Sequence, residues 1–180
     1  RFQAALKQKE ESFRKASIRE AAFAGKSYEK EPERLKGQLE EYCKGSDGPG
    51  APGAGGERGA SGLKGVVAPH IDFQRGGFCY ASAHREVKEK SSNHCFVIFG
   101  TAHTLTENPF CLTRKDFMTP LGWLNTDVEV IDAIQSRCSE DLFKDEGVHR
   151  SEHSIEFQCI FLRYLYPEPL SLKIVPILCG

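Results

Sequence analysis

The chain has 180 residues, of which 27% are charged and 39% are hydrophobic, and its formal net charge at pH 7 is −1. This length is enough for one domain with a sizeable core, or for most of a larger one. The even charge balance argues against a nucleic-acid-binding surface. Since no apolar stretch approaches the roughly 18 residues of a membrane span, the sequence also argues against a transmembrane protein.

The seven cysteines do not predict a disulfide framework or a zinc site. None of them forms a C-x-x-C pair, and Cys95, Cys159 and Cys179 stand inside apolar runs, where a free thiol behaves as a small hydrophobe. We therefore expect reduced cysteines and a cytoplasmic protein. The first residue is Arg1 rather than Met, which leaves open a removed targeting segment.

The first 44 residues are charged and favour two helices. A thin apolar stripe marks the first helix: Phe2, Ala5, Leu6, Phe13 and Ala16. Pro32 suits the first turn of the second helix, which carries Leu35, Leu39 and Tyr42.

Residues 45–65 are low in complexity, with glycine at every third position from Gly50 to Gly65. This period resembles collagen, but about five triplets are too few to hold three chains together. We therefore expect a flexible linker or insertion that has no regular structure over 45–62 and packs on nothing.

Two short hydrophobic runs, 66–70 and 95–100, each lead to a histidine, His70 and His103. We expect both runs to be buried strands, joined by a helix from about residue 78 to 90. Such a crossover makes the strands parallel neighbours, so both histidines would lie at the edge where open α/β sheets bind ligands. Two imidazoles there can begin a metal site, although each histidine could instead only cap a loop.

The rest of the chain continues the alternation of helices and strands. Residues Thr126–Glu129 resemble a capping box that opens a helix. A second helix, over 152–166, has one apolar face: Ile155, Cys159, Leu162 and Tyr166. Residues 172–179 read as a buried strand, although Pro176 argues against a central position. The predicted fold class is α/β, with a mixed, largely parallel sheet flanked by helices, and we expect the domain to continue beyond Gly180.

A further candidate site lies just before the second of these helices. If Ser151 caps it, Glu152 and His153 occupy its first turn, where a histidine can transfer a proton or bind an anion. Spacing alone favours the ordinary alternative, in which Glu152 interacts with the helix dipole and His153 is a surface residue. The chain contains no G-x-S-x-G elbow and no Walker loop.

Four motifs follow one another along the chain, APHIDF, GTAH, TPLGWLNTD and EHSIEFQ, after an opening AGKSYEKEPERLKGQLEEY. In this order they resemble the Memo family, which includes the group called AmmeMemoRadiSam system protein B. The resemblance runs from about Ala24 to Gly180 and implies a fold similar to class III extradiol dioxygenases. It divides the chain into a helical segment 1–44 that belongs to the domain at least from residue 24, a linker or insertion 45–65, and the N-terminal portion of a Memo-like domain, 66–180.

The resemblance also implies a metal pocket. It assigns His70 and His103 as ligands of one metal ion and places His153 at the acid/base position of the same pocket. Glu152, next to His153, is the second catalytic candidate, and the expected ion is iron or copper. The family's third metal-site residue is a cysteine in a later stretch, so it is expected beyond residue 180. Within this chain Asp72, next but one to His70, is the first suspect for an additional carboxylate.

Two classes of function remain open. In a metal-dependent redox enzyme, two histidines and one anionic ligand leave positions on the ion for O2 or substrate, and His153 moves a proton. In a non-catalytic binding module, the same pocket holds a peptide or a phosphorylated partner. Either reading implies a small molecule or peptide as partner, with no nucleic acid and no membrane span.

Overall fold

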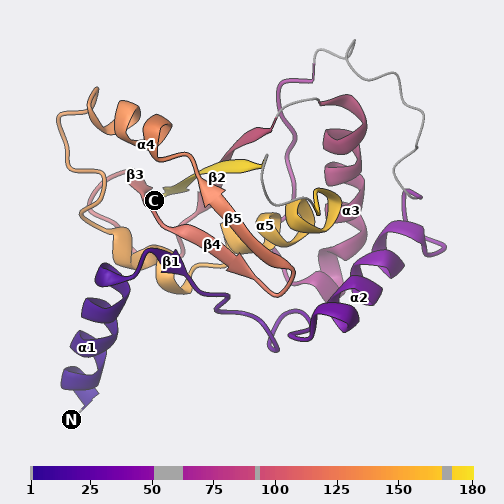
Figure 1. Cartoon of the computed structure of the whole chain (residues 1–180), viewed down its shortest axis with the longest axis horizontal. Helices are drawn as coiled ribbons and strands as arrows, with labels where there is room; N and C mark the ends of the chain where they lie inside the picture. The colour runs from indigo at the N-terminus through magenta and orange to yellow at the C-terminus, as the bar shows by residue number, and fades with distance from the viewer. Residues whose placement is uncertain (1, 51–62, 92–93, 168–171) are drawn as a thin grey trace.

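Figure 1 shows a computed structural model of the chain, which describes residues 2–50, 63–91, 94–167 and 172–180. Its helices are α1 (Phe2–Lys15), α2 (Pro32–Lys44), α3 (Phe73–Lys90), α4 (Val128–Gln135), the 3-10 helix η1 (Glu146–Ser151) and α5 (Ser154–Leu165). Its strands are β1 (Ile18–Arg19), β2 (Cys95–Thr101), β3 (Phe110–Leu112), β4 (Asp116–Thr119), β5 (Gly122–Thr126) and β6 (Lys173–Cys179).

The described strands form one mixed sheet in the order β1-β4-β5-β6-β2, with β3 also paired to β6. The pairs β1–β4, β5–β6 and β2–β6 are parallel, while β4–β5 and β3–β6 are antiparallel. The tight turn of the β4–β5 hairpin is the TPLG segment, in which Gly122 adopts a φ of 112°. The predicted fold class, a mixed and largely parallel sheet flanked by helices, is confirmed.

Alternate residues of β6 point to opposite faces of the sheet and pack against different helices. Ile174 and Leu178 belong to the cluster that packs on α5, whereas Val175 and Ile177 pack with Ile131 of α4. Helices α4 and α5 therefore cover the two faces of the sheet.

Strand β6 is central, contrary to the expectation from Pro176. On its β2 side the parallel register is continuous, with Pro176 opposite Ile98. On its other side β5 pairs only with Lys173 and Ile174, and β3 pairs from Ile177 onward. Pro176 lies between these two ladders, where the strand needs no donor on that side, so a residue without an N–H is tolerated.

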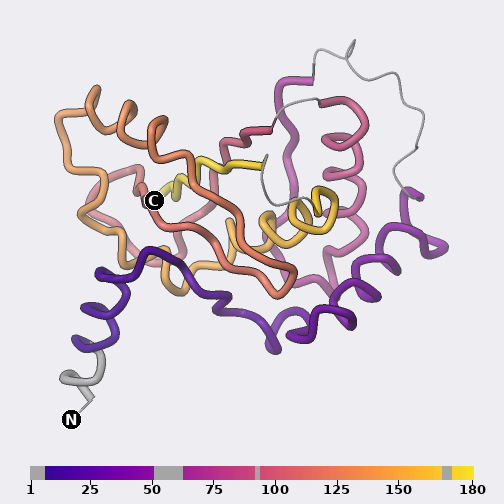
Figure 2. Tube along the Cα trace, in the orientation of Figure 1, coloured from indigo at the N-terminus to yellow at the C-terminus, as the bar shows by residue number. Residues whose placement is uncertain are grey.

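Helix α5 is buried on both sides, which explains its high apolar content. The predicted face of Ile155, Cys159 and Leu162 packs on the sheet. The opposite face packs in a cluster with α2 and α3: Phe157, Ile160 and Phe161 against Leu35, Leu39, Cys43, Phe73, Tyr80 and Ala81. Figure 2 follows the N-terminal segment as it leaves α1, passes β1 and reaches α2.

The predicted strand 66–70 is wrong. These residues form no strand in the structure, and the parallel neighbour of β2 is β6. The run is not buried either, since the side chain of Val67 is 99% exposed. Residues 63–68 and Cys95–Phe99 of β2 line one cavity of about 620 Å³. The run thus lies near β2 without pairing to it, and Pro69 removes one donor that a ladder would use.

Three smaller expectations also change. The helix predicted from residue 78 begins at Phe73, because the Asp72 carboxylate accepts the Arg75 N–H and caps it. The cap of α4 is Asp127, whose carboxylate accepts the Val130 N–H, because Thr126 is the last residue of β5. In the predicted linker, the Pro49 carbonyl accepts a hydrogen bond from Arg85, so this end lies against α3.

The glycine repeat at 51–62, and the side chains of Phe2, Ala5 and Leu6 in the predicted stripe, lie outside the described residues. The seven cysteines are free, as expected. Among the described residues, no helix is both long and apolar enough to cross a bilayer.

Candidate functional site

Three histidines from distant parts of the sequence lie together. The ring centroids of His103 and His153 are 4.7 Å apart, those of His70 and His103 are 5.2 Å apart, and those of His70 and His153 are 5.9 Å apart. The structure therefore brings the two histidines expected to bind metal and the one expected at the acid/base position into a single cluster.

The fold positions each histidine by a different contact. His103 follows β2, whose extension is fixed by a 2.7 Å hydrogen bond from Ala102 N–H to the Cys179 carbonyl. His70 lies before α3, where the Gln158 amide donates to the Pro69 carbonyl at 3.0 Å. His153 directly precedes α5, whose first turn is joined to β2 by the 2.9 Å bond from Ser154 Oγ to the Thr101 carbonyl.

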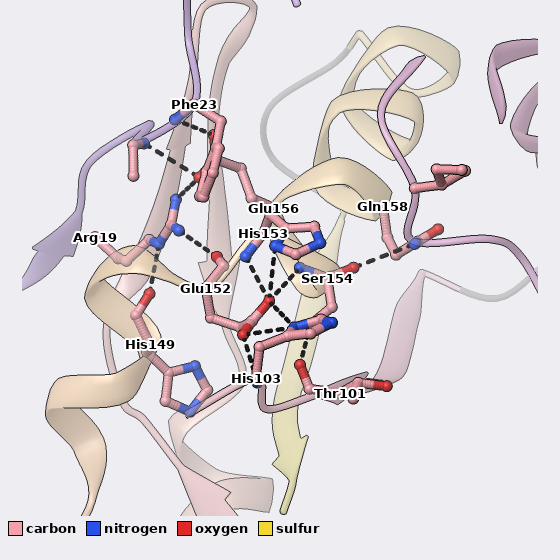
Figure 3. A network of polar contacts seen from close by, with 12 residues as sticks. Arg19, Phe23, Thr101, His103, His149, Glu152, His153, Ser154, Glu156 and Gln158 are labelled. Carbon is pink, nitrogen blue, oxygen red and sulfur yellow. Dashed lines mark hydrogen bonds and ion pairs between the residues drawn. The ribbon is translucent and has the colours of Figure 1, made fainter. Parts of the chain in front are cut away.

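Glu152 is the hub of this cluster, as Figure 3 shows. Its carboxylate accepts the backbone N–H groups of His103 (2.9 Å), His153 (2.7 Å) and Ser154 (3.0 Å). The same carboxylate lies 3.0 Å and 3.2 Å from Nδ1 of His103 and 3.1 Å from Nδ1 of His153. One acid thus connects the end of β2 with the start of α5.

These contacts keep Glu152 ionised. Burial by itself would raise its pKa, but the hydrogen bonds from the backbone of His103 and Ser154, and from the His103 ring, outweigh it and lower the pKa below the usual value. An ionised carboxylate can only accept, so Nδ1 of His103 carries the proton of their shared hydrogen bond. In the neutral ring this leaves Nε2 of His103 with a free lone pair.

His153 is held in its neutral form. Burial is the largest cause of its lowered pKa, and the neighbouring His103 and His70 rings lower it further, against the opposing effect of Glu152. Phe23 contacts the same ring edge-on, with centroids 5.5 Å apart. A neutral imidazole can accept a proton or bind a metal ion.

The predicted helix start is wrong by two residues. Ser151 ends η1 instead of capping α5, and His153 occupies the cap position, with Ser154 as the first helical residue. The side chain that satisfies the exposed N–H groups there is Glu152, which lies outside the helix. A negative charge at this helix N-terminus is also favoured by the helix dipole.

One group of the described residues has the arrangement of a metal-binding site: His103, Glu152 and His153 each offer a ligand atom within 4.8 Å of the others. Asp72 has a different partner, because its carboxylate caps α3 and binds the Arg75 guanidinium, with Nε at 2.6 Å. The cluster is open to solvent on one side, since the His103 side chain is 47% exposed while that of Glu152 is 5% exposed.

The remaining histidines serve the core or the surface. His84 and His149 are buried, and one ring nitrogen of each contacts a backbone carbonyl, of Tyr80 at 3.0 Å and of Cys111 at 3.1 Å. His94 is exposed, and its carbonyl accepts the Lys173 N–H. Spacing along the sequence gave no signal for Phe23 as a neighbour of His153, because the two residues are separated by most of the chain.

The fold and this cluster define a mixed α/β protein with a candidate metal-binding group between the end of one parallel strand and the start of a buried helix. The chain belongs to the Memo family, because the family model described as "Memo-like protein" matches residues 19–180.

Similar proteins carry the same family name. A "MEMO1 family protein" of Aquifex aeolicus is 34% identical over 177 residues, which is 98% of this chain and 43% of that protein. Those of Methanopyrus kandleri and Methanosarcina mazei are 34% and 30% identical, over 88% and 91% of this chain and 55% and 54% of their own lengths. The chain thus spans about half the length of these relatives.

Proposed function

We propose that the histidine cluster holds a single redox-active metal ion, iron or copper, with His70 and His103 as ligands. The observation that carries this proposal is the hydrogen bond between the Glu152 carboxylate and Nδ1 of His103. Metal-binding histidines commonly donate their second ring N–H to a carboxylate, which fixes the tautomer and turns the other nitrogen toward the ion.

The donor set fits such an ion. Imidazole suits iron and copper, and two histidines with one anionic ligand leave further positions open. When bound, the ion would supply Lewis-acid and redox chemistry to a substrate at these positions. The Glu152 carboxylate, which accepts the Nδ1 proton of His103, supplies negative charge next to the ligand rather than a ligand atom.

His153 and Glu152 then have distinct roles beside the ion. The neutral ring of His153 lies against the ring of His103, so it can take a proton from a bound substrate and return it. Glu152 accepts the Nδ1 proton of His103, lies 3.1 Å from Nδ1 of His153, and balances positive charge that builds up on either ring. The partner we propose is a small molecule, or a peptide side chain that reaches the exposed side of His103.

Metal titration tests this proposal. Anaerobic calorimetry with Fe²⁺, and separately with Cu²⁺, measures the affinity of the unchanged chain, of H103A and of the matched control H94A, which removes an exposed histidine outside the cluster. We expect binding of one ion, a loss of affinity for H103A that exceeds the roughly 10- to 100-fold cost of removing a residue that only orients a ligand, and no change for H94A.

The same affinity in H103A as in the unchanged chain would contradict the proposed site. Absence of binding by the unchanged chain would favour the alternative, in which the pocket holds a peptide or phosphorylated partner without a metal. Peptide binding by the metal-free chain that depends on His103 would then support that alternative directly.

A further inference from the structure

A second polar cluster lies directly behind the histidines and is completely buried. Its centre is the ion pair between Arg19 of β1 and Glu156 of α5, whose side chains are 0% and 1% exposed. No solvent reaches this pair, and 136 residues of sequence lie between its two members. Figure 3 shows Arg19 next to the backbone that leads to His153.

The Arg19 guanidinium holds the turn that carries the candidate site. Its Nε donates to the His149 carbonyl at 2.9 Å, and its Nη2 donates to the Glu152 carbonyl at 2.6 Å. Its Nη1 donates to the Glu156 carboxylate and to the Glu20 carbonyl. Arg19 thus binds the chain on both sides of His153, at the residue before it and in the first turn of the helix after it.

Glu156 is in turn fixed by the N-terminal segment. Its carboxylate accepts the backbone N–H groups of Ala22 at 3.1 Å and Phe23 at 3.0 Å, and the hydroxyl of Tyr28. Burial and the Glu156 charge raise the pKa of Tyr28, so this hydroxyl stays protonated and donates. Every partner of the carboxylate is therefore a donor, as a buried charge requires.

Fold stability alone gives little reason for this arrangement. A buried ion pair recovers its desolvation cost only with excellent geometry, and apolar replacements of similar volume are often neutral or stabilising. Unlike an apolar side chain, arginine can fix the positions of several acceptors at once, because its planar guanidinium donates hydrogen bonds in set directions. Here the acceptors include the carbonyl of Glu152, whose carboxylate accepts from the His103 ring and from the His153 backbone N–H.

We propose that Arg19 is a positioning residue for the histidine cluster: clamped by Glu156, it sets the backbone of the 149–156 turn and thereby the orientation of the Glu152 carboxylate. The N-terminal segment then helps to orient the side chains of the candidate site, although it contributes no metal ligand. The test of this inference by metal affinity rests on the proposed function. The test by the tautomer of the imidazole rings does not.

Two variants separate positioning from folding. R19K keeps the charge beside Glu156 but cannot bind the two carbonyls as a fork. The double variant R19M/E156Q removes both charges and leaves an acceptor for Tyr28 and the amides. Matched controls change the exposed Arg114–Asp132 pair in the same way, as R114K and R114M/D132N.

The first measurement is the ¹⁵N spectrum of the histidine rings in the metal-free chain. We expect the signal of the His103 ring to show one fixed tautomer, with the proton on Nδ1, and to move toward a mixture of tautomers in both Arg19 variants. The second measurement is Fe²⁺ affinity, which should fall about 10- to 100-fold. The Arg114 controls should change neither.

Unchanged ring spectra and unchanged affinity in folded R19K and R19M/E156Q would overturn the inference. Loss of the folded state in both variants would also count against it, because the pair would then be a requirement of the fold. If the unchanged chain binds no metal but the ring spectra shift, the proposed function fails while the positioning role of Arg19 stands.

Discussion

Burial lowers the pKa values of two histidines, His84 and His149, so acid should destabilise this chain, and the share due to His84 can be measured by substitution. The His84 ring lies inside the packing of α3 and α5, stacked on Phe161 at 5.3 Å between centroids and on Tyr80 at 6.4 Å. Burial lowers its pKa to about 4, and the one opposing effect is its hydrogen bond to the Tyr80 carbonyl.

The size of the stability loss follows from the difference between the pKa of His84 in the folded chain and in the unfolded chain. An unfolded histidine has a pKa of about 6.5, so below that pH the unfolded chain takes up a proton that folded His84 resists. Its contribution to stability is therefore complete above about pH 6.5 and is lost as the pH falls toward 4. Between about pH 7 and pH 5 the loss is roughly 2 kcal/mol, a large part of the 5–15 kcal/mol typical of a domain.

Urea unfolding followed by far-ultraviolet circular dichroism at both pH values measures this loss. The variant H84F keeps an aromatic ring between Tyr80 and Phe161 but cannot take up a proton, and H94A removes an exposed histidine instead. We expect the stability of H84F to depend less on pH than that of the unchanged chain, by roughly 2 kcal/mol over this interval. H94A should keep the original dependence. Equal pH dependence in H84F and the unchanged chain would refute the reasoning.

Two glycines at close contacts give further predictions, both measured as the free energy of unfolding in urea. G77A would place a Cβ 2.6 Å from the Tyr42 ring. Alanine favours a helix, but we expect this close contact to lower the free energy of unfolding by about 1–3 kcal/mol. A higher free energy of unfolding would show that the ring moves away freely. G100A would place a Cβ 2.6 Å from the side chains of Ile155 and Ser154. We expect a similar loss of stability together with weaker metal binding. Unchanged stability would contradict the close approach of α5 to β2.

The sequence predicted the sheet class and most helices because these depend on local pattern. The face of α5 and the strand 172–179 follow from hydrophobic period and length. The prediction of a strand at 66–70 was wrong because strand formation also depends on distant residues. An apolar run becomes a strand only when a neighbouring strand forms backbone hydrogen bonds with it. In this structure β6 takes that place beside β2.

The candidate site was partly within reach of the sequence. The histidines His70, His103 and His153 stood out through their motifs, and the structure brings their rings together, while their roles remain predictions. The contribution of Arg19 and Tyr28 had no local signal, since each binds Glu156 across more than 120 residues of sequence. Only the folded structure shows that the two-residue strand β1 places the positive charge of Arg19 next to the histidine cluster.

The contacts also divide the site into a fixed part and an adjustable part. Glu152 binds three backbone N–H groups at once, so His103 and His153 are tied to the ends of β2 and α5 before any ligand arrives. His70 is exposed, and the Pro69 carbonyl before it accepts a hydrogen bond from the Gln158 side chain of α5. Under the proposed function, we therefore expect the His70 ring to move more than the rings of His103 and His153 when a ligand binds.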